Sequence, residues 1–144
     1  MRGDRYPGVD TLRGCDGWAR FGLKAWHVRS VLVIDDEDLA RRSTLRLLAQ
    51  LGFRQLFEAS SAAQALELLA TLRPGLVLTD MSMETPLAGL EVVRFATANQ
   101  IAVAVVSGRQ PCLPRELDGT LWIAKDHLSL TLLERELPAL LAAR

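Results

Sequence analysis

Five short apolar runs, separated by helical patterns, constrain the fold of this chain more than any other feature. The first run, residues 31–34, is Val-Leu-Val-Ile and has no polar interruption. A strand that is buried on both faces has this composition, because no position along it faces water. Alternation of such strands with helices predicts an α/β fold, in which helices cover both faces of one parallel sheet. Three others occupy residues 76–79, 101–106 and 121–124, and residues 55–58, Gln-Leu-Phe-Glu, form a weaker second one.

Residues with helix-capping chemistry lie at the ends of the helical patterns. We expect Asp38 to cap the first helix and Gly52 to end it. Ser61, followed three residues later by glutamine, fits a capping box for the second helix. Ser129 is expected to cap the last helix. Pro138 lies inside that last pattern, so we expect it to kink or end the helix.

The first 29 residues differ from the rest of the chain. They hold five of the ten glycines and no periodic apolar pattern, so ordering them would cost much conformational entropy. They also hold half of the eight aromatic residues, and docking through those rings is the alternative, as is a wrongly assigned start of translation. We expect a flexible N-terminal extension over residues 1–29 and a single domain over residues 30–144.

The charge of the chain sums to zero, but its two parts carry opposite signs. Six basic and three acidic residues give residues 1–29 a charge of +3, which leaves −3 on residues 30–144. An acidic domain argues against a nucleic-acid partner, and no apolar run approaches the roughly 20 residues of a membrane span. With two distant cysteines and no signal-peptide pattern, we expect a cytoplasmic protein with free thiols and no membrane partner.

Polar side chains follow four of the five predicted strands at the point where each strand ends. Asp35 and Asp36 follow the first strand, Asp80 the third, Ser107 the fourth and Lys125 the fifth. Ligands of open parallel sheets bind at this edge. Three neighbouring carboxylates repel one another unless a cation lies between them, and an all-oxygen set suits Mg²⁺. Such an ion beside an ammonium and a hydroxyl is suited to a phosphoryl group, which a carboxylate can itself accept.

Lys125 is the most specific member of this set. Only two of the 17 basic residues are lysines, and Lys125 is the only one in residues 30–144. An ammonium is not interchangeable with a guanidinium, so a lone lysine in an arginine-rich domain points to a particular role. Taken singly, the other members also fit a solvated helix start at residues 35–38 and ordinary turns at Asp80 and Ser107.

The chain resembles the receiver domain of bacterial two-component response regulators, of the chemotaxis-regulator kind that acts without an output domain. The resemblance implies a flavodoxin-like (βα)₅ three-layer sandwich, in which a five-stranded parallel sheet has the order 2-1-3-4-5. It covers roughly residues 28–143. The stretches that carry it are residues 31–36, 57–59, 76–80, 89–91, Ser107 and residues 122–125.

The resemblance also implies roles in phosphoryl transfer. Asp80 would accept a phosphoryl group from a histidine kinase or phosphotransfer protein. Mg²⁺ would be held by Asp35, Asp36 and Asp80, with the backbone carbonyl of Ser82 as a further ligand. The protein would not be an enzyme in the usual sense, although it could catalyse its own phosphorylation and dephosphorylation.

A second group of residues would convert phosphorylation into a signal. Lys125 would pair with the phosphoryl group, Ser107 would move to hydrogen-bond it, and Trp122 would occupy the aromatic switch position. The switched state would control a protein partner of unknown identity, or a second copy of the chain in a homodimer.

The sequence departs from the usual receiver pattern at three places. Asp126 follows the lysine where the family usually has proline, which puts another carboxylate near the site. Glu84 follows Met83 where the family also has proline, and the loop to Gly89 is one residue longer than usual. The segment over residues 107–122 is short and holds two prolines. We therefore expect a shortened or irregular fourth helix and an atypical output face.

Two other functions fit parts of the sequence. A receiver-like interaction module that phosphate does not regulate would accommodate the changed loop and Asp126. A phosphatase of the haloacid dehalogenase type also uses aspartate, serine, lysine and Mg²⁺. It needs a second acidic residue two positions after the nucleophile, however. That position is Ser82 after Asp80, and Glu37 after Asp35 without the family's following pattern.

Overall fold

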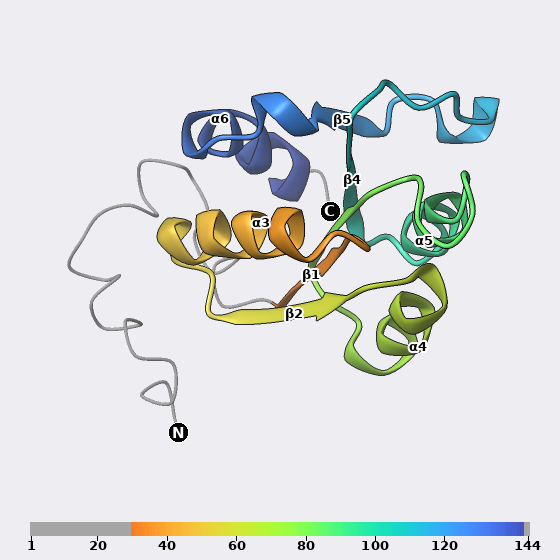
Figure 1. Cartoon of the computed structure of the whole chain (residues 1–144), viewed down its shortest axis with the longest axis horizontal. Coiled ribbons are helices and arrows are strands. Elements are labelled where there is room, and N and C mark those ends of the chain that lie inside the picture. Colours follow the sequence, from red (N-terminus) through yellow and green to blue (C-terminus); the bar gives the residue numbers. More distant parts are fainter. Residues whose placement is uncertain (1–29, 143–144) are drawn as a thin grey trace.

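A five-stranded parallel sheet lies at the centre of the computed structural model, which describes residues 30–142 (Figure 1). The strands are arranged in the order β2-β1-β3-β4-β5, and every neighbouring pair is parallel. The predicted flavodoxin-like topology is therefore confirmed, while the prediction for residues 1–29 falls outside the described residues. The strands are β1 (Ser30–Ile34), β2 (Gln55–Ala59), β3 (Leu76–Thr79), β4 (Ala102–Ser107) and β5 (Leu121–Ala124).

The apolar runs correspond to strands whose burial follows their place in the sheet. Every residue of β3 and of β4 is buried, and so are all residues of β1 except the first. The edge strands β2 and β5 are mostly half-buried or exposed. The three inner strands are buried because helices cover both of their faces. The sequence of β5 is equally apolar, but its place at the edge leaves most of it only half-buried.

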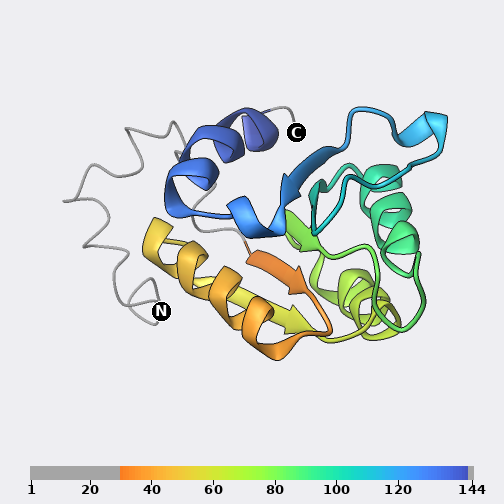
Figure 2. The same cartoon turned by 45° about the horizontal axis from the view of Figure 1, so that its top comes forward.

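Two pairs of helices cover the two faces of the sheet (Figures 1 and 2). Helices α3 and α6 pack with one set of strand residues, and α4 and α5 pack with the other set. Each strand contributes to both core clusters because its successive side chains point to opposite faces. The helices are α3 (Asp38–Leu51), α4 (Ala62–Leu72), α5 (Gly89–Ala98) and α6 (Leu130–Ala142).

Most of the predicted helix ends are confirmed. Gly52 ends α3 in the left-handed conformation, with φ of 106°. Ser61 and Ser129 each accept a backbone N–H of their own helix at 3.1 Å. The prediction that Asp38 caps α3 is wrong: Asp38 is the first helical residue, and Glu37 takes the N-cap position without a side-chain cap.

Two prolines in the region between β4 and β5 produce the irregularity predicted there. Residues 108–114 form no helix, and only the short 3-10 helix η3 (Arg115–Leu117) precedes β5.

Pro138 does not end α6, which continues for four residues to Ala142. None of the helices within residues 30–142 is long and apolar enough to cross a membrane.

Candidate functional site

Three aspartates meet at the carboxyl edge of the sheet. Asp35 follows β1 and Asp80 follows β3, and the parallel pairing of Ile34 with Thr79 brings these two aspartates side by side. One oxygen atom from each of Asp35, Asp36 and Asp80 lies within 4.8 Å of the others. Asp35 is 5% exposed and Asp80 is 8% exposed, whereas Asp36 faces solvent. An open set of hard oxygen ligands with one solvated side fits Mg²⁺.

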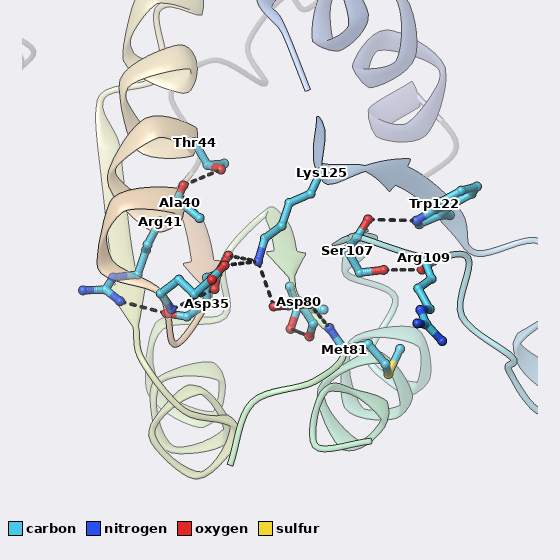
Figure 3. Close-up of polar contacts among 12 residues, drawn as sticks. Asp35, Ala40, Arg41, Thr44, Asp80, Met81, Ser107, Arg109, Trp122 and Lys125 are labelled. Carbon is cyan, nitrogen blue, oxygen red and sulfur yellow. Dashed lines mark hydrogen bonds and ion pairs between the residues drawn. The ribbon is translucent and has the colours of Figure 1, made fainter. Parts of the chain in front are cut away.

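Lys125 extends from the end of β5 into this cluster (Figure 3). Its Nζ atom lies 2.9 Å from Asp35 Oδ2, 2.8 Å from Glu37 Oε1 and 3.0 Å from Asp80 Oδ2. Partial burial opposes the charge, but hydrogen bonds to the three carboxylates outweigh it and raise the pKa of Lys125. The ammonium therefore stays charged and offsets part of the negative charge of the aspartates.

Folding makes the negative charge of Asp35 costly. Burial raises the pKa of Asp35 above its ordinary value, although the backbone N–H of Glu37 and the ammonium of Lys125 favour the carboxylate. A divalent cation beside Asp35 would relieve that cost, because an opposite charge stabilises the ionised form. The burial of Asp35 and the all-oxygen ligand set therefore both favour binding of a cation at this site.

The carboxylate of Asp80 has a fixed orientation. Its Oδ1 accepts the backbone N–H of Met81 at 2.7 Å, while Oδ2 faces Lys125. Behind it, α5 begins at Gly89, whose N–H donates to the Met81 carbonyl at 2.8 Å. A Cβ atom on Gly89 would lie 2.2 Å from the Asp80 carbonyl oxygen. Only glycine allows the helix to start this close to Asp80.

Ser107 and Trp122 lie on the far side of Asp80 (Figure 3). Ser107 is the last residue of β4, and Trp122 is the second residue of β5. Ser107 is buried, and its hydroxyl donates to the Arg109 carbonyl at 2.5 Å. The indole Nε1 of Trp122 donates to the Ser107 carbonyl at 3.3 Å. The two residues that the resemblance assigns to switching are therefore in direct contact.

A crevice of about 550 Å³ opens beside Asp80. Its walls come from the loop after β3, including Ser82 and Pro86, and from residues 108–111 after β4. Because these last residues form no helix, they leave room beside the carboxylate. Asp126, expected to bring another carboxylate to the site, is instead exposed in the short helix η4 (Lys125–His127) and is not among the three carboxylates that contact Lys125.

Arg41 supports the site from α3 and was not predicted from the sequence. Its Nη1 donates to the Asp35 carbonyl at 2.8 Å, its Nε to Glu58 at 2.6 Å and its Nη2 to Asp38 at 2.7 Å. The arginine is buried on the inner face of α3, seven residues before the core residue Leu48. A charged residue on an otherwise apolar helix face was the signal available for finding it.

The model of the response regulator receiver domain family matches residues 31–113 of the chain. Over 79 residues, the chain is 40% identical to the positive alginate biosynthesis regulatory protein of Pseudomonas aeruginosa, covering 54% of this chain and 32% of that protein. It is 36% identical over 77 residues to response regulator GacA of the same organism, covering 53% of this chain and 36% of GacA. The chain thus spans about a third of the length of these curated relatives.

Solved receiver domains share the fold. A CheY-like receiver domain from Methylobacillus flagellatus superposes with a TM-score of 0.66 at 24% identity, covering 78% of this chain and 98% of that one. The receiver domain of a modulated diguanylate cyclase from Desulfovibrio desulfuricans G20 superposes with a TM-score of 0.70 at 21% identity. This match covers 81% of this chain and 95% of that one. At these identities the likeness is one of fold.

Proposed function

This chain belongs to the response regulator receiver domain family, and on that premise we propose that it accepts a phosphoryl group on Asp80 in a Mg²⁺-dependent reaction. The donor would be the phosphohistidine of a histidine kinase or phosphotransfer protein, which would place the reaction in the cytoplasm. The observation that carries the proposal is the position of Asp80. Its carboxylate lies 3.0 Å from the Lys125 ammonium and within 4.8 Å of two further aspartates.

The proposed reaction forms a bond between phosphorus and an Asp80 oxygen while the phosphorus–nitrogen bond of the donor breaks and its imidazole leaves. When bound at the three aspartates, Mg²⁺ neutralises charge on the transferring phosphoryl group. Lys125 supplies a second positive charge, and the Met81 N–H orients the carboxylate. The protein acts through positioning and electrostatics, and the crevice beside Asp80 admits the donor.

Phosphorylation would be read out through Ser107 and Trp122. We expect the Ser107 hydroxyl to exchange its bond to the Arg109 carbonyl for one to the phosphoryl group. Because Trp122 donates to the carbonyl of the same serine, movement of Ser107 changes the surroundings of the indole. The phosphoryl group then favours one of two conformations, and a protein partner that binds that conformation better would be controlled by it.

The test is phosphorylation by acetyl phosphate, or binding of beryllofluoride, in the presence of Mg²⁺. Trp18 and Trp26 are replaced by phenylalanine so that Trp122 alone reports by fluorescence. We expect labelling of the protein with a change in Trp122 emission, and loss of both in Asp80→Asn. Asp118→Asn, an exposed carboxylate in the β4–β5 segment, is the matched control and should behave as wild type. Labelling that persists in Asp80→Asn would refute the assignment of Asp80.

A receiver-like interaction module without phosphate regulation is the second candidate. The observation that favours it is the β4–β5 segment, where residues 108–114 form no helix and only η3 occupies the place of the helix in the usual output face. A folded protein that binds Mg²⁺ but takes neither phosphoryl group nor beryllofluoride would support this candidate over the first.

A further inference from the structure

The loop between β3 and α5 carries the reactive residue but has few internal constraints. It begins at Asp80, includes Ser82, and its apex over residues 84–87 is exposed. Within the loop, Met83 and Ala88 each donate a backbone N–H to the Thr85 carbonyl, at 3.0 Å and 3.2 Å. These bonds shape a turn, but they do not fix the apex of the loop relative to the rest of the domain.

Glu84 connects this apex to a different helix. Its Oε1 accepts the backbone N–H of Ala62 at 2.8 Å, and its Oε2 accepts that of Ala63 at 3.1 Å. These are the first two residues of α4, more than 20 positions earlier in the chain. Each of the two carboxyl oxygens thus accepts one backbone N–H, which is the arrangement that a carboxylate satisfies fully.

Helix α4 already has a cap of its own. Ser61 accepts the N–H of Gln64 at 3.1 Å, and the Gln64 side chain accepts the N–H of Ser60 at 2.9 Å. Glu84 takes the two N–H groups that this arrangement leaves unpaired, where the positive end of the helix dipole favours a carboxylate. Since α4 can begin without Glu84, the main consequence of the contact is for the loop.

We propose that Glu84 is a positioning residue for the metal site. By tying the loop to α4, it holds the Ser82 backbone in the position that Mg²⁺ needs beside Asp80. Receivers usually have proline at this position, which restricts the loop through its ring, whereas this chain restricts it through two charge-assisted hydrogen bonds. The inference rests on the proposed function, because it assumes that Asp80 and the Ser82 carbonyl are metal ligands.

The test compares Glu84→Ala and Glu84→Gln with wild type in a direct Mg²⁺ titration by calorimetry. We expect Glu84→Ala to bind Mg²⁺ about tenfold more weakly, as is typical when a group that orients metal ligands is lost. The glutamine variant should lie between, since its amide oxygen can accept only one of the two bonds well. Phosphorylation at saturating Mg²⁺ should stay within about twofold of wild type, because the metal restores the loop once bound.

The matched control is Glu67→Gln, which removes the same charge from an exposed position of α4 that does not touch the loop. It should leave the Mg²⁺ affinity unchanged. Backbone hydrogen exchange of Ala62 and Ala63 should rise in Glu84→Ala and not in the control. Wild-type Mg²⁺ affinity in Glu84→Ala would overturn the inference, even if that variant were less stable, while the proposed function stood. A wild-type protein that neither binds Mg²⁺ nor becomes labelled would overturn both.

Discussion

At the scale of single residues, Gly89 matters through the side chain it lacks. A Cβ atom there would lie 2.2 Å from the Asp80 carbonyl oxygen and 2.8 Å from the Cα of Met81, both backbone atoms that cannot rotate away. We expect Gly89→Ala to push Asp80 out of position. Overpacking should lower the free energy of unfolding by about 1–3 kcal/mol. Phosphorylation should slow on the order of 100-fold, the size that a displacement of about 1 Å can produce.

A second glycine provides the control for this prediction. Gly108 follows Ser107 at the same edge of the sheet, but a Cβ atom there would meet nothing within 4 Å. Gly108→Ala should therefore keep both stability and phosphorylation near wild type. Urea denaturation and the rate of labelling by acetyl phosphate measure the two effects. Equal behaviour of the two variants would show that the close approach of α5 to Asp80 is not required.

Some residues of the site could be predicted from the sequence, and others could not. The aspartates after β1 and β3, with Ser107 and Lys125, could be predicted to converge because each follows a strand and parallel strands end at one edge. The roles of Arg41 and Glu84 could not be predicted. Their partners lie on other elements, and nothing in the local sequence says which helix or loop their side chains will meet.

At the scale of elements, helix α6 continues past the proline that was predicted to kink or end it. Pro138 lies inside the helix, although its ring removes one backbone hydrogen bond. The buried side chains of Leu133, Leu137 and Leu141 belong to the core cluster that α6 shares with α3. Packing of this apolar stripe against the sheet outweighs the local cost of proline, so the helix continues.

The cost of Pro138 to the stability of the protein should be measurable. We expect Pro138→Ala to raise the free energy of unfolding by about 1–3 kcal/mol, because alanine restores the missing helical bond without disturbing the stripe. Pro114→Ala is the control: Pro114 precedes η3 in extended chain, where its ring interrupts no α-helix, and its loss should bring no gain. The midpoint of urea unfolding of each variant, compared with that of wild type, measures its effect on stability. An unchanged or lower midpoint for Pro138→Ala would show that the ring itself contributes packing.

The β4–β5 segment shows local sequence and structure in agreement. Pro111 and Pro114 made a regular fourth helix unfavourable, and residues 108–114 form no helix. The size of the resulting crevice could not be predicted, because it depends on how this segment lies against the loop after β3. Patterns along the chain thus predicted which elements form, while the spaces between elements required the tertiary structure.

At the scale of the whole molecule, the site places negative charge where folding makes it costly. The sheet order brings Asp35, Asp36 and Asp80 together. Within residues 30–142, the cation that pairs with this cluster is Lys125, whose ammonium also pairs with Glu37. In the unfolded chain these carboxylates are solvated, and Asp80 is far from the adjacent pair Asp35 and Asp36. The folded state therefore carries an electrostatic cost that a bound cation would remove, which links Mg²⁺ binding to stability.

We accordingly expect Mg²⁺ to stabilise the folded protein against urea. A ligand that binds only the folded state at 100 times its dissociation constant adds about 2.7 kcal/mol to the free energy of unfolding. NaCl at matched ionic strength should produce much less, because screening does not replace coordination. Asp36→Asn removes one charge of the cluster at an exposed position, so the variant should fold and lose most of the gain from Mg²⁺. Equal stabilisation of wild type and Asp36→Asn would mean that Mg²⁺ acts elsewhere, and would separate the acidic cluster from metal binding.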